Sequence, residues 1–259
     1  MGQLPLDKMK ELAFSDCWYW LLLAAVLSYF LGCINFAVII SKILHKDVRK
    51  IGSGNPGAMN MSREFGLKVG FVNFLSDCLK GGIPVIILYF IFKDYRFAGT
   101  DIHVADIARY LAGASAVIGH IYPVTMKFKG GKGIASTCGV FWFGLGCEQW
   151  WFFFMVLVGL FIVTLFIFIT EMGSMGSLLG VTGFSIWQGV VFFDRYYDLM
   201  QGASSATTGY IAALFMLLIL LNFLTWFAHR KNLVRLFAGE EHRTSVKKLR
   251  GGKRGMDNM

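Results

Sequence analysis

The sequence has few charged residues. They make up 16% of the 259 residues, against about a quarter in a typical soluble domain, while 56% of the residues are hydrophobic and the mean hydropathy is +0.57. This balance excludes an ordinary soluble domain and predicts an integral membrane protein. The chain also lacks zinc-ligand spacing, RNP-like motifs and basic helices interleaved with aromatics, so its net charge of +9 points to membrane sidedness and anionic ligands rather than nucleic acid.

Several signals of other chemistry are missing as well. The five cysteines form no C-x-x-C pair, and four of them lie within or beside apolar runs. We therefore predict buried thiols without a disulfide or metal role. No P-loop sequence is present, and no A-x-A cleavage site follows the first apolar run. That run is expected to be a retained helix rather than a signal peptide.

Seven apolar runs reach or approach the roughly 20 residues of a membrane-spanning helix. They are Cys17–Leu44, Val69–Phe92, Val104–Gly119, Gly133–Cys147, Trp150–Ile169, Ser174–Phe193 and Gly209–Phe227. The third and fourth are short, so they could be tilted or half-buried by their neighbours. The sequence thus predicts an all-α, polytopic membrane protein with about seven spans. We expect one membrane-embedded domain over 1–241 and a basic, disordered tail over 242–259.

The positive charges are distributed unevenly between the two ends of these runs. With the C-terminus inside, segments 42–68, 120–132 and 228–259 share one face and carry 6, 3 and 9 Lys or Arg residues, 18 of the 25 in the chain. Cytoplasmic loops of membrane proteins are enriched in Lys and Arg. These three segments are therefore predicted to lie in the cytoplasm.

Polar segments gather on this predicted cytoplasmic face. In IGSGNPGAMNMSR (51–63), glycines could turn successive backbone N–H groups into one concavity for phosphate oxygens, with Arg63 as a charged wall. Glycine alone is equally compatible with a flexible loop. Asp77 and Lys80 lie three residues apart in the next apolar run, where such a pair either neutralises itself or faces a wet cavity.

Two further polar segments follow on the same face. Lys132 lies among glycines where a new helix starts, and helix N-termini attract anions. His120, earlier in that segment, is more often a cap or a structural residue in such a place. In HRKNLVRLFAGEE (229–241), His229, Asn232 and either Arg235 or Leu236 recur on one helical face, a pattern that alone would fit a solvated helix. Together the segments predict a site where a soluble anion meets an apolar chain.

These motifs resemble the bacterial acyl-phosphate:glycerol-3-phosphate acyltransferases of phospholipid synthesis. The resemblance covers G-S-G-N-x-G-A-x-N-x-x-R at 52–63, D-x-x-K-G-x-x-P-V at 77–85, G-H-x-x-P-V at 119–124, F-K-G-G-K-G-x-A at 128–135 and H-x-x-N-x-x-R-L-x-x-G-x-E at 229–241, with a weaker S-x-G-S at 174–177. It implies an enzyme of the bacterial plasma membrane, with its site facing the cytoplasm and no cofactor. Such an enzyme moves an acyl group from acyl phosphate to the 1-hydroxyl of glycerol 3-phosphate.

The resemblance also implies roles for individual residues. The implied catalytic residues are Arg63, Lys132, His229 and Asn232. Substrate-binding roles fall to Ser53, Gly54, Asn55, Gly57, Asn60, Lys80, Ser136 and Ser174, and supporting roles to Asp77, His120, Arg235 and Glu241. The hydroxyl proton could go to His229 or to a phosphate oxygen of a substrate, and the sequence leaves both open. Met59 stands where the family usually has threonine, which removes one hydroxyl donor.

The implied partners are acyl phosphate, glycerol 3-phosphate and the bilayer, and a further candidate is the enzyme that makes acyl phosphate. One rival interpretation is an acyltransferase that uses thioesters and an H-x-x-x-x-D base. The fifth residue after each histidine is never aspartate here, which argues against that chemistry. The other rival is an anion transporter, whose cations should spread through the membrane depth rather than gather at one face.

Overall fold

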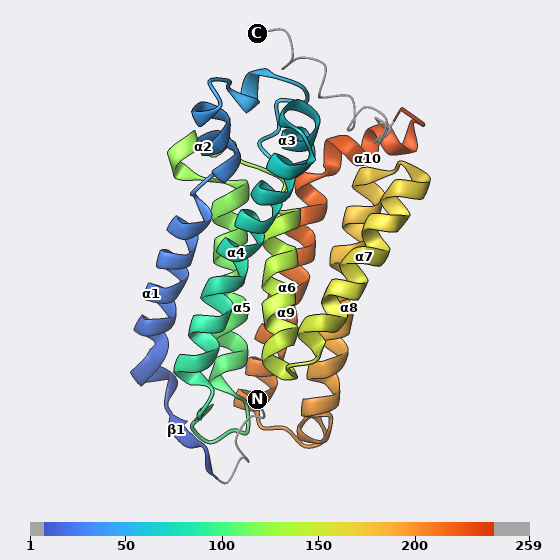
Figure 1. The fold of residues 1–259 in the computed structure, drawn as a ribbon. Helices are drawn as coiled ribbons and strands as arrows, with labels where there is room; N and C mark the ends of the chain where they lie inside the picture. The colour runs from blue at the N-terminus through green and yellow to red at the C-terminus, as the bar shows by residue number, and fades with distance from the viewer. Residues whose placement is uncertain (1–7, 241–259) are drawn as a thin grey trace, which may run out of the picture.

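The structure is a computed structural model that describes residues 8–240, and it is a bundle of long, roughly parallel helices (Figure 1). In chain order the helices are α1 (Phe14–Gly32), α2 (Phe36–Ile43), α3 (Ala58–Phe65), α4 (Leu67–Phe92), α5 (Val104–Ile121), α6 (Ile134–Glu148), α7 (Phe152–Thr170), α8 (Gly173–Met200), α9 (Ser205–Ala228) and α10 (Arg230–Phe237). Two short 3-10 turns, η2 (Val48–Lys50) and η3 (Val124–Met126), lie between these helices. The prediction of an all-α fold is confirmed.

One feature departs from that prediction. The short strands β1 (Lys10–Leu12) and β2 (Tyr95–Phe97) pair in parallel, with Lys10 opposite Tyr95. They lie at the end of the bundle away from α2, α3 and α10 (Figure 1). Three residues per strand give no hydrophobic alternation that a sequence pattern could show. This end of the bundle is called the strand end below, and the other the site end.

Within residues 8–240, five helical stretches are long and apolar enough to cross a membrane: Phe14–Ile43, Leu67–Phe92, Phe152–Thr170, Gly173–Met200 and Ser205–Ala228. Each coincides with a predicted run. The other two predicted runs form α5 and α6, of 18 and 15 residues. Helix α5 is buried along most of its surface, so it need not be uniformly apolar. The total of seven spans remains a prediction.

The predicted run Cys17–Leu44 contains two helices rather than one, because the chain breaks between α1 and α2. The side chain of Asn35 caps α2 by accepting a hydrogen bond from the Val38 N–H at 3.1 Å. The carbonyl of Ile34, freed by the break, accepts a hydrogen bond from Lys80 Nζ at 2.7 Å. The break leaves an N–H group at the start of α2 and a carbonyl group after α1 without partners inside a helix. Both find side-chain partners here, so neither is left unsatisfied.

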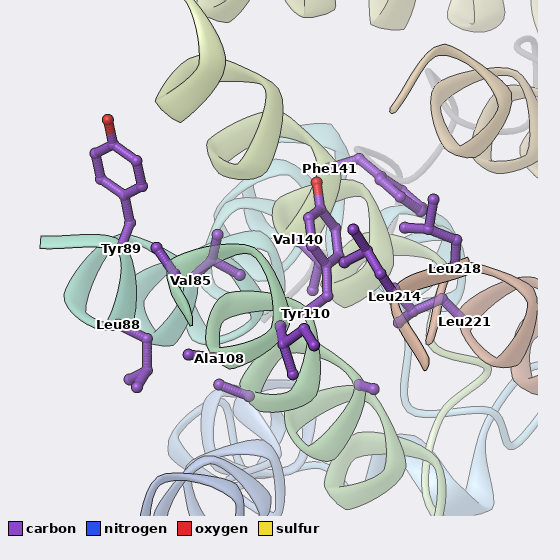
Figure 2. Packing of buried hydrophobic residues seen from close by; sticks show 14 of the residues in the cluster. Val85, Leu88, Tyr89, Ala108, Tyr110, Val140, Phe141, Leu214, Leu218 and Leu221 are labelled. Carbon is purple, nitrogen blue, oxygen red and sulfur yellow. The ribbon is translucent and has the colours of Figure 1, made fainter. Parts of the chain in front are cut away.

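Apolar side chains from α4, α5, α6 and α9 meet in the core (Figure 2). Helices α4 and α6 touch backbone to backbone. A Cβ on Gly139 would lie only 1.9 Å from the backbone oxygen of Cys78, and one on Gly81 only 2.1 Å from that of Ser136. Small residues permit such close approach between membrane helices. The contact fixes the start of α6 beside the charged segment of α4.

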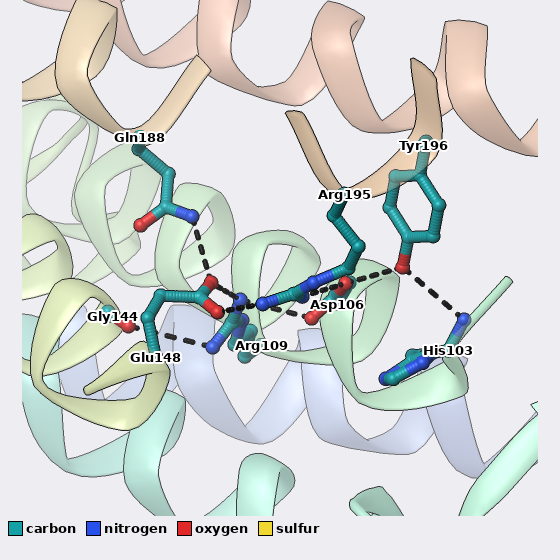
Figure 3. Close-up of polar contacts among 8 residues, drawn as sticks. All are labelled: His103, Asp106, Arg109, Gly144, Glu148, Gln188, Arg195 and Tyr196. Carbon is teal, nitrogen blue, oxygen red and sulfur yellow. Dashed lines mark hydrogen bonds and ion pairs between the residues drawn. The ribbon is translucent and has the colours of Figure 1, made fainter. Parts of the chain in front are cut away.

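A buried ionic cluster joins α5, α6 and α8 towards the strand end (Figure 3). Asp106 contacts Arg109 at 2.9 Å and Arg195 at 2.6 Å, and Glu148 contacts both arginines. Gln188 donates a further hydrogen bond to Glu148 at 2.8 Å. Two carboxylates and two guanidinium groups leave no net charge, which is how ionisable groups persist in a membrane interior. Asp106 lies three residues before Arg109, but the contacts with Glu148 and Arg195 join residues that are far apart in the chain and cannot be read from the sequence.

Candidate functional site

A cavity of about 700 Å³ opens at the site end of the bundle. Its walls come from α3, α4, α6, α7, α8 and the α9–α10 junction. Twelve of the residues that the sequence singles out line it, namely Ser53, Asn55, Gly57, Asn60, Arg63, Asp77, His120, Lys132, Ser174, His229, Asn232 and Arg235. The volume is typical of small-molecule sites. Segments separated by more than 170 residues of sequence therefore meet in one place.

The glycine-rich loop before α3 is organised by Asn60. The Asn60 side chain accepts a hydrogen bond from the Ser53 N–H at 3.1 Å and donates to the carbonyls of Val48 and Ile51 at 3.3 and 3.2 Å. Gly52 passes so close that a Cβ there would lie 2.3 Å from Asn60 Oδ1. Asn60 therefore shapes the loop from within.

The backbone N–H groups of this loop do not form the open concavity that the sequence suggests. The Gly54 N–H bonds to the Ile51 carbonyl, that of Gly57 bonds to the Asn55 carbonyl, and that of Asn55 lies 3.4 Å from Ser53 Oγ. These three N–H groups and that of Ser53 are therefore engaged within the loop and with Asn60. What it offers the cavity is the set of side chains on Ser53, Asn55 and Arg63, together with the first turn of α3.

Asp77 lies at the centre of a buried polar group on α4 and α5. Its carboxylate accepts a hydrogen bond from Asn73 at 3.3 Å, pairs with Lys80 at 2.8 Å and lies 3.6 Å from His120 Nδ1. Of the two readings of the Asp77 and Lys80 pair, mutual neutralisation is what the geometry supports. Lys80 does not line the cavity, since its ammonium bridges Asp77 and the carbonyl of Ile34.

The loop that carries Lys132 packs closely against His120. The N–H groups of Gly130 and Gly131 donate to the carbonyls of Ile121 and His120, each at 3.1 Å. A Cβ on Gly131 would lie 2.1 Å from His120 Nε2. Glycine is therefore required here by space. The loop ends at Gly133, whose φ of +84° is the left-handed conformation that starts α6.

This arrangement brings Lys132 to the cavity at the N-terminus of α6, where the helix dipole adds to its charge. Lys132 is also close enough to His229 to help lower the pKa of that imidazole. Lys127 and Lys129, in the same loop, are exposed and do not line the cavity. Geometry thus separates Lys132 from the other two lysines of the segment.

His229 is held at the junction of α9 and α10 in a defined tautomer. Its Nδ1 lies 2.8 Å from the Thr225 carbonyl, which can only accept, so Nδ1 carries the proton and Nε2 keeps its lone pair. The side chain is buried, and burial together with the charge of Lys132 lowers its pKa to about 4. The imidazole is therefore neutral at physiological pH and presents an acceptor nitrogen.

A chain of side-chain hydrogen bonds connects α10 to α8. Arg235 Nη2 donates to the side-chain oxygen Oδ1 of Asn232 at 2.8 Å, and Asn232 Nδ2 donates to Ser174 Oγ at 2.6 Å. All three side chains line the cavity. Ser174 thereby orients the amide of Asn232, and Asn232 orients the guanidinium of Arg235.

The cavity continues from these polar groups into an apolar part. Phe71 and Phe74 of α4, Trp142 of α6, Phe161 of α7 and Phe184 of α8 line it. Sequence reasoning missed this wall, because apolar residues that face a groove look the same in a hydrophobic run as those that face lipid. One cavity thus joins cations at one end to hydrocarbon-like surface at the other.

Three other predicted site residues among residues 8–240 lie outside the cavity lining. Gly54, Lys80 and Ser136 do not line the cavity, and Ser136 is buried against Gly81 of α4. Glu241 and the predicted basic tail lie outside the described residues. Met59, which stands where the family usually has threonine, does line the cavity.

Comparisons with known proteins agree with this picture. A family model for glycerol-3-phosphate acyltransferase matches residues 22–239. The chain is 36% identical to the glycerol-3-phosphate acyltransferase of Mycoplasma pneumoniae over 228 residues, covering 85% of this chain and 92% of that protein. It is 34% identical to the glycerol-3-phosphate acyltransferase of Finegoldia magna over 223 residues, covering 86% of this chain and 95% of that protein.

A solved structure shows the same fold. The crystal structure of PlsY, an integral membrane glycerol 3-phosphate acyltransferase, in its glycerol 3-phosphate form matches with a TM-score of 0.67 and 28% identity. The match covers 89% of this chain and 98% of that chain. The lysophosphatidic acid form of PlsY matches with a TM-score of 0.66 and 26% identity.

Proposed function

Since the chain belongs to the glycerol-3-phosphate acyltransferase family, and is an integral membrane enzyme of PlsY type in phospholipid biosynthesis, we propose that its acyl donor is acyl phosphate. The observation that carries this proposal is the single cavity with cationic and apolar ends. An acyl phosphate is such a molecule, with a compact anion on a hydrocarbon chain. The products are 1-acylglycerol 3-phosphate and inorganic phosphate.

The two phosphate-bearing substrates repel each other unless cations lie around them. Arg63 stands beside the glycine-rich loop and offers a fork of donors to the donor's phosphate, with Ser53 and Asn55 as neutral partners. Lys132, at the N-terminus of α6, lies near His229, and with Asn232 it would hold glycerol 3-phosphate. Asn60, Asp77 and His120, which line the cavity, and Lys80, which lies behind its wall, would support this geometry through the contacts described above.

In the reaction the glycerol 1-oxygen attacks the acyl carbon, the new C–O ester bond forms, and the bond from the acyl carbon to the phosphate oxygen breaks. Acyl phosphate is already activated, so positioning and charge stabilisation supply the acceleration. His229 Nε2 can accept a hydrogen bond from the 1-hydroxyl. Burial lowers the pKa of His229 to about 4, which makes it a weak base, and we propose that the departing phosphate takes the proton.

The site would face the cytoplasm of a bacterial plasma membrane, where glycerol 3-phosphate is soluble. Support comes from the positive charges, 18 of 25 Lys and Arg residues falling in the three segments that share this face. A reporter fused after Met259 is expected to behave as cytosolic, and a periplasmic signal would contradict this orientation. The enzyme that makes acyl phosphate is a candidate partner at the same face.

The donor is tested with purified protein in lipid, glycerol 3-phosphate and matched acyl chains on phosphate, coenzyme A or acyl carrier protein. We expect product from acyl phosphate without added metal or nucleotide, and essentially none from either thioester. Inorganic phosphate should compete with acyl phosphate, and Arg63→Ala should weaken that competition because it removes the charged donors. Faster product formation from acyl-coenzyme A would reject acyl phosphate as the donor.

A further inference from the structure

A second cavity, of about 620 Å³, lies between α1 and α4 and shares no residue with the first. On α1 its wall runs from Asp16 and Trp20 to Leu27 and Leu31, one face of the helix. On α4 it includes the ring of Pro84. We call this cavity the α1–α4 groove.

The groove exists because α1 is held against α5 rather than α4. A Cβ on Gly32 would lie 2.1 Å from the carbonyl oxygen of Ala116, and one on Gly119 would lie 2.1 Å from that of Tyr29. These contacts bring the two backbones together near the site end. The α4 side is left open, and Leu27 on its rim is 60% exposed.

The length and lining of the groove favour a hydrocarbon chain as its occupant. From Asp16 to Leu31 a helix rises about 22 Å, at 1.5 Å per residue. Apart from Asp16 and Ser28, the residues that line the groove are apolar or aromatic. In a bilayer, a hydrocarbon chain lying along this wall would supply it with dispersion contacts.

The strand end of the groove carries both signs of charge. Asp16 lines it there, in the first turn of α1. Tyr95 lines the same end, and Lys10 Nζ lies 5.9 Å from the centre of its ring. Trp20 adds an aromatic side chain of the kind enriched at membrane interfaces. A carboxylate in this mouth and an ammonium beside its tyrosine complement a headgroup that itself has an ammonium and a phosphate.

We propose that the α1–α4 groove binds one acyl chain of a zwitterionic phospholipid, taken from the leaflet opposite the candidate active site. The headgroup ammonium lies at Asp16 and its phosphate at Lys10, while the chain runs between Leu27 and Pro84. This site is independent of the catalytic cavity. Its failure would leave the proposed function untouched.

The test is native mass spectrometry of the full chain, with phosphatidylethanolamine or phosphatidylglycerol of identical chains added. Leu27→Trp fills the groove, whereas Val26→Trp adds the same indole to an exposed neighbour that does not line it. We expect the bound phosphatidylethanolamine to be lost in Leu27→Trp and kept in Val26→Trp. Ile91→Trp fills the groove from α4 and should also lose the lipid, provided that circular dichroism shows a folded protein.

The headgroup preference is tested with Asp16→Asn, and Asp94→Asn is the control because Asp94 does not line the groove. Asp16→Asn should weaken phosphatidylethanolamine binding by about 2–5-fold, the effect of one exposed ion pair. Equal binding of both lipids by the native chain, or unchanged binding in folded Leu27→Trp and Ile91→Trp variants, would overturn the proposal. A dimer that Leu27→Trp disrupts would overturn it in favour of a second copy.

Discussion

Lys80 on α4 donates a hydrogen bond from Nζ to the backbone carbonyl of Ile34, at the break between α1 and α2, over 2.7 Å. The same ammonium neutralises Asp77 at 2.8 Å, and both side chains are buried. The resemblance to known acyltransferases implies that Lys80 contacts substrate. Its position behind the cavity wall instead favours a supporting role, in which it fixes the helix break and the carboxylate near His120.

We expect Lys80→Met to lower the free energy of unfolding by about 3–5 kcal/mol, because it leaves the Asp77 carboxylate buried without its cation. The double variant Asp77→Asn with Lys80→Met removes both charges and should recover most of that loss. Unfolding in detergent, followed by circular dichroism, measures both. If Lys80→Met is as stable as the native chain but has a raised KM for a phosphate substrate, Lys80 is a substrate ligand after all.

The second prediction concerns the contact between Gly131 and His120. Gly131→Ala should lower the free energy of unfolding by about 1–3 kcal/mol, the usual cost of overpacking, because its Cβ would lie 2.1 Å from His120 Nε2. Gly183→Ala on α8 is the matched control, since open space surrounds that glycine. Adding His120→Ala to Gly131→Ala should restore part of the stability. No rescue would mean that the imidazole is not what excludes a side chain.

Much of the fold could be predicted from the sequence because a bilayer imposes helices of a certain length. All seven predicted runs contain helix. The break at Asn35 could not be seen, since its stability depends on Lys80, which is 45 residues further along the chain. The partners in the ionic cluster of Asp106 and Arg195 were likewise hidden, because three helices must pack before those charges meet.

The candidate site was predictable to the extent that its residues are polar in an apolar chain. Lys132 and Asn232 stand out for that reason, and both line the cavity. The sequence could not show that Asn60 is engaged by its own loop, nor that Trp142 and Phe184 form the apolar wall. Those facts depend on which side chains face one another, and hydrophobic pattern carries no such information.

The third prediction concerns the protonation of His229. A histidine in an unfolded chain has a pKa of about 6.5, whereas burial lowers that of His229 to about 4. As the pH falls from about 6.5 to about 4, the unfolded chain gains a proton that the folded chain does not. The contribution of His229 to the free energy of unfolding therefore falls with pH, by up to about 1.4 kcal/mol per unit.

Comparing pH-dependent unfolding of the native chain with that of His229→Gln measures this contribution. The variant should lose stability less steeply between pH 6.5 and 4. His45→Gln is the control, because His45 is exposed. Equal slopes for the native chain and His229→Gln would show that His229 takes up its proton as readily in the folded protein as in the unfolded one.

The last prediction separates three lysines of one loop. Lys132 lies at the N-terminus of α6 and lines the cavity, while Lys127 and Lys129 are exposed outside it. If Lys132 stabilises charge that develops on phosphate as the acyl bond breaks, Lys132→Ala should lower kcat by about 10²–10³, the usual loss for one preorganised donor. Lys127→Ala and Lys129→Ala should change kcat little, since exposed charges are screened by salt.

Initial rates of phosphate release at saturating glycerol 3-phosphate, for variants of equal helix content, show which lysine kcat depends on. A large loss at Lys127 or Lys129 with none at Lys132 would move the catalytic charge to a different lysine, and the helix N-terminus would lose its place in the mechanism.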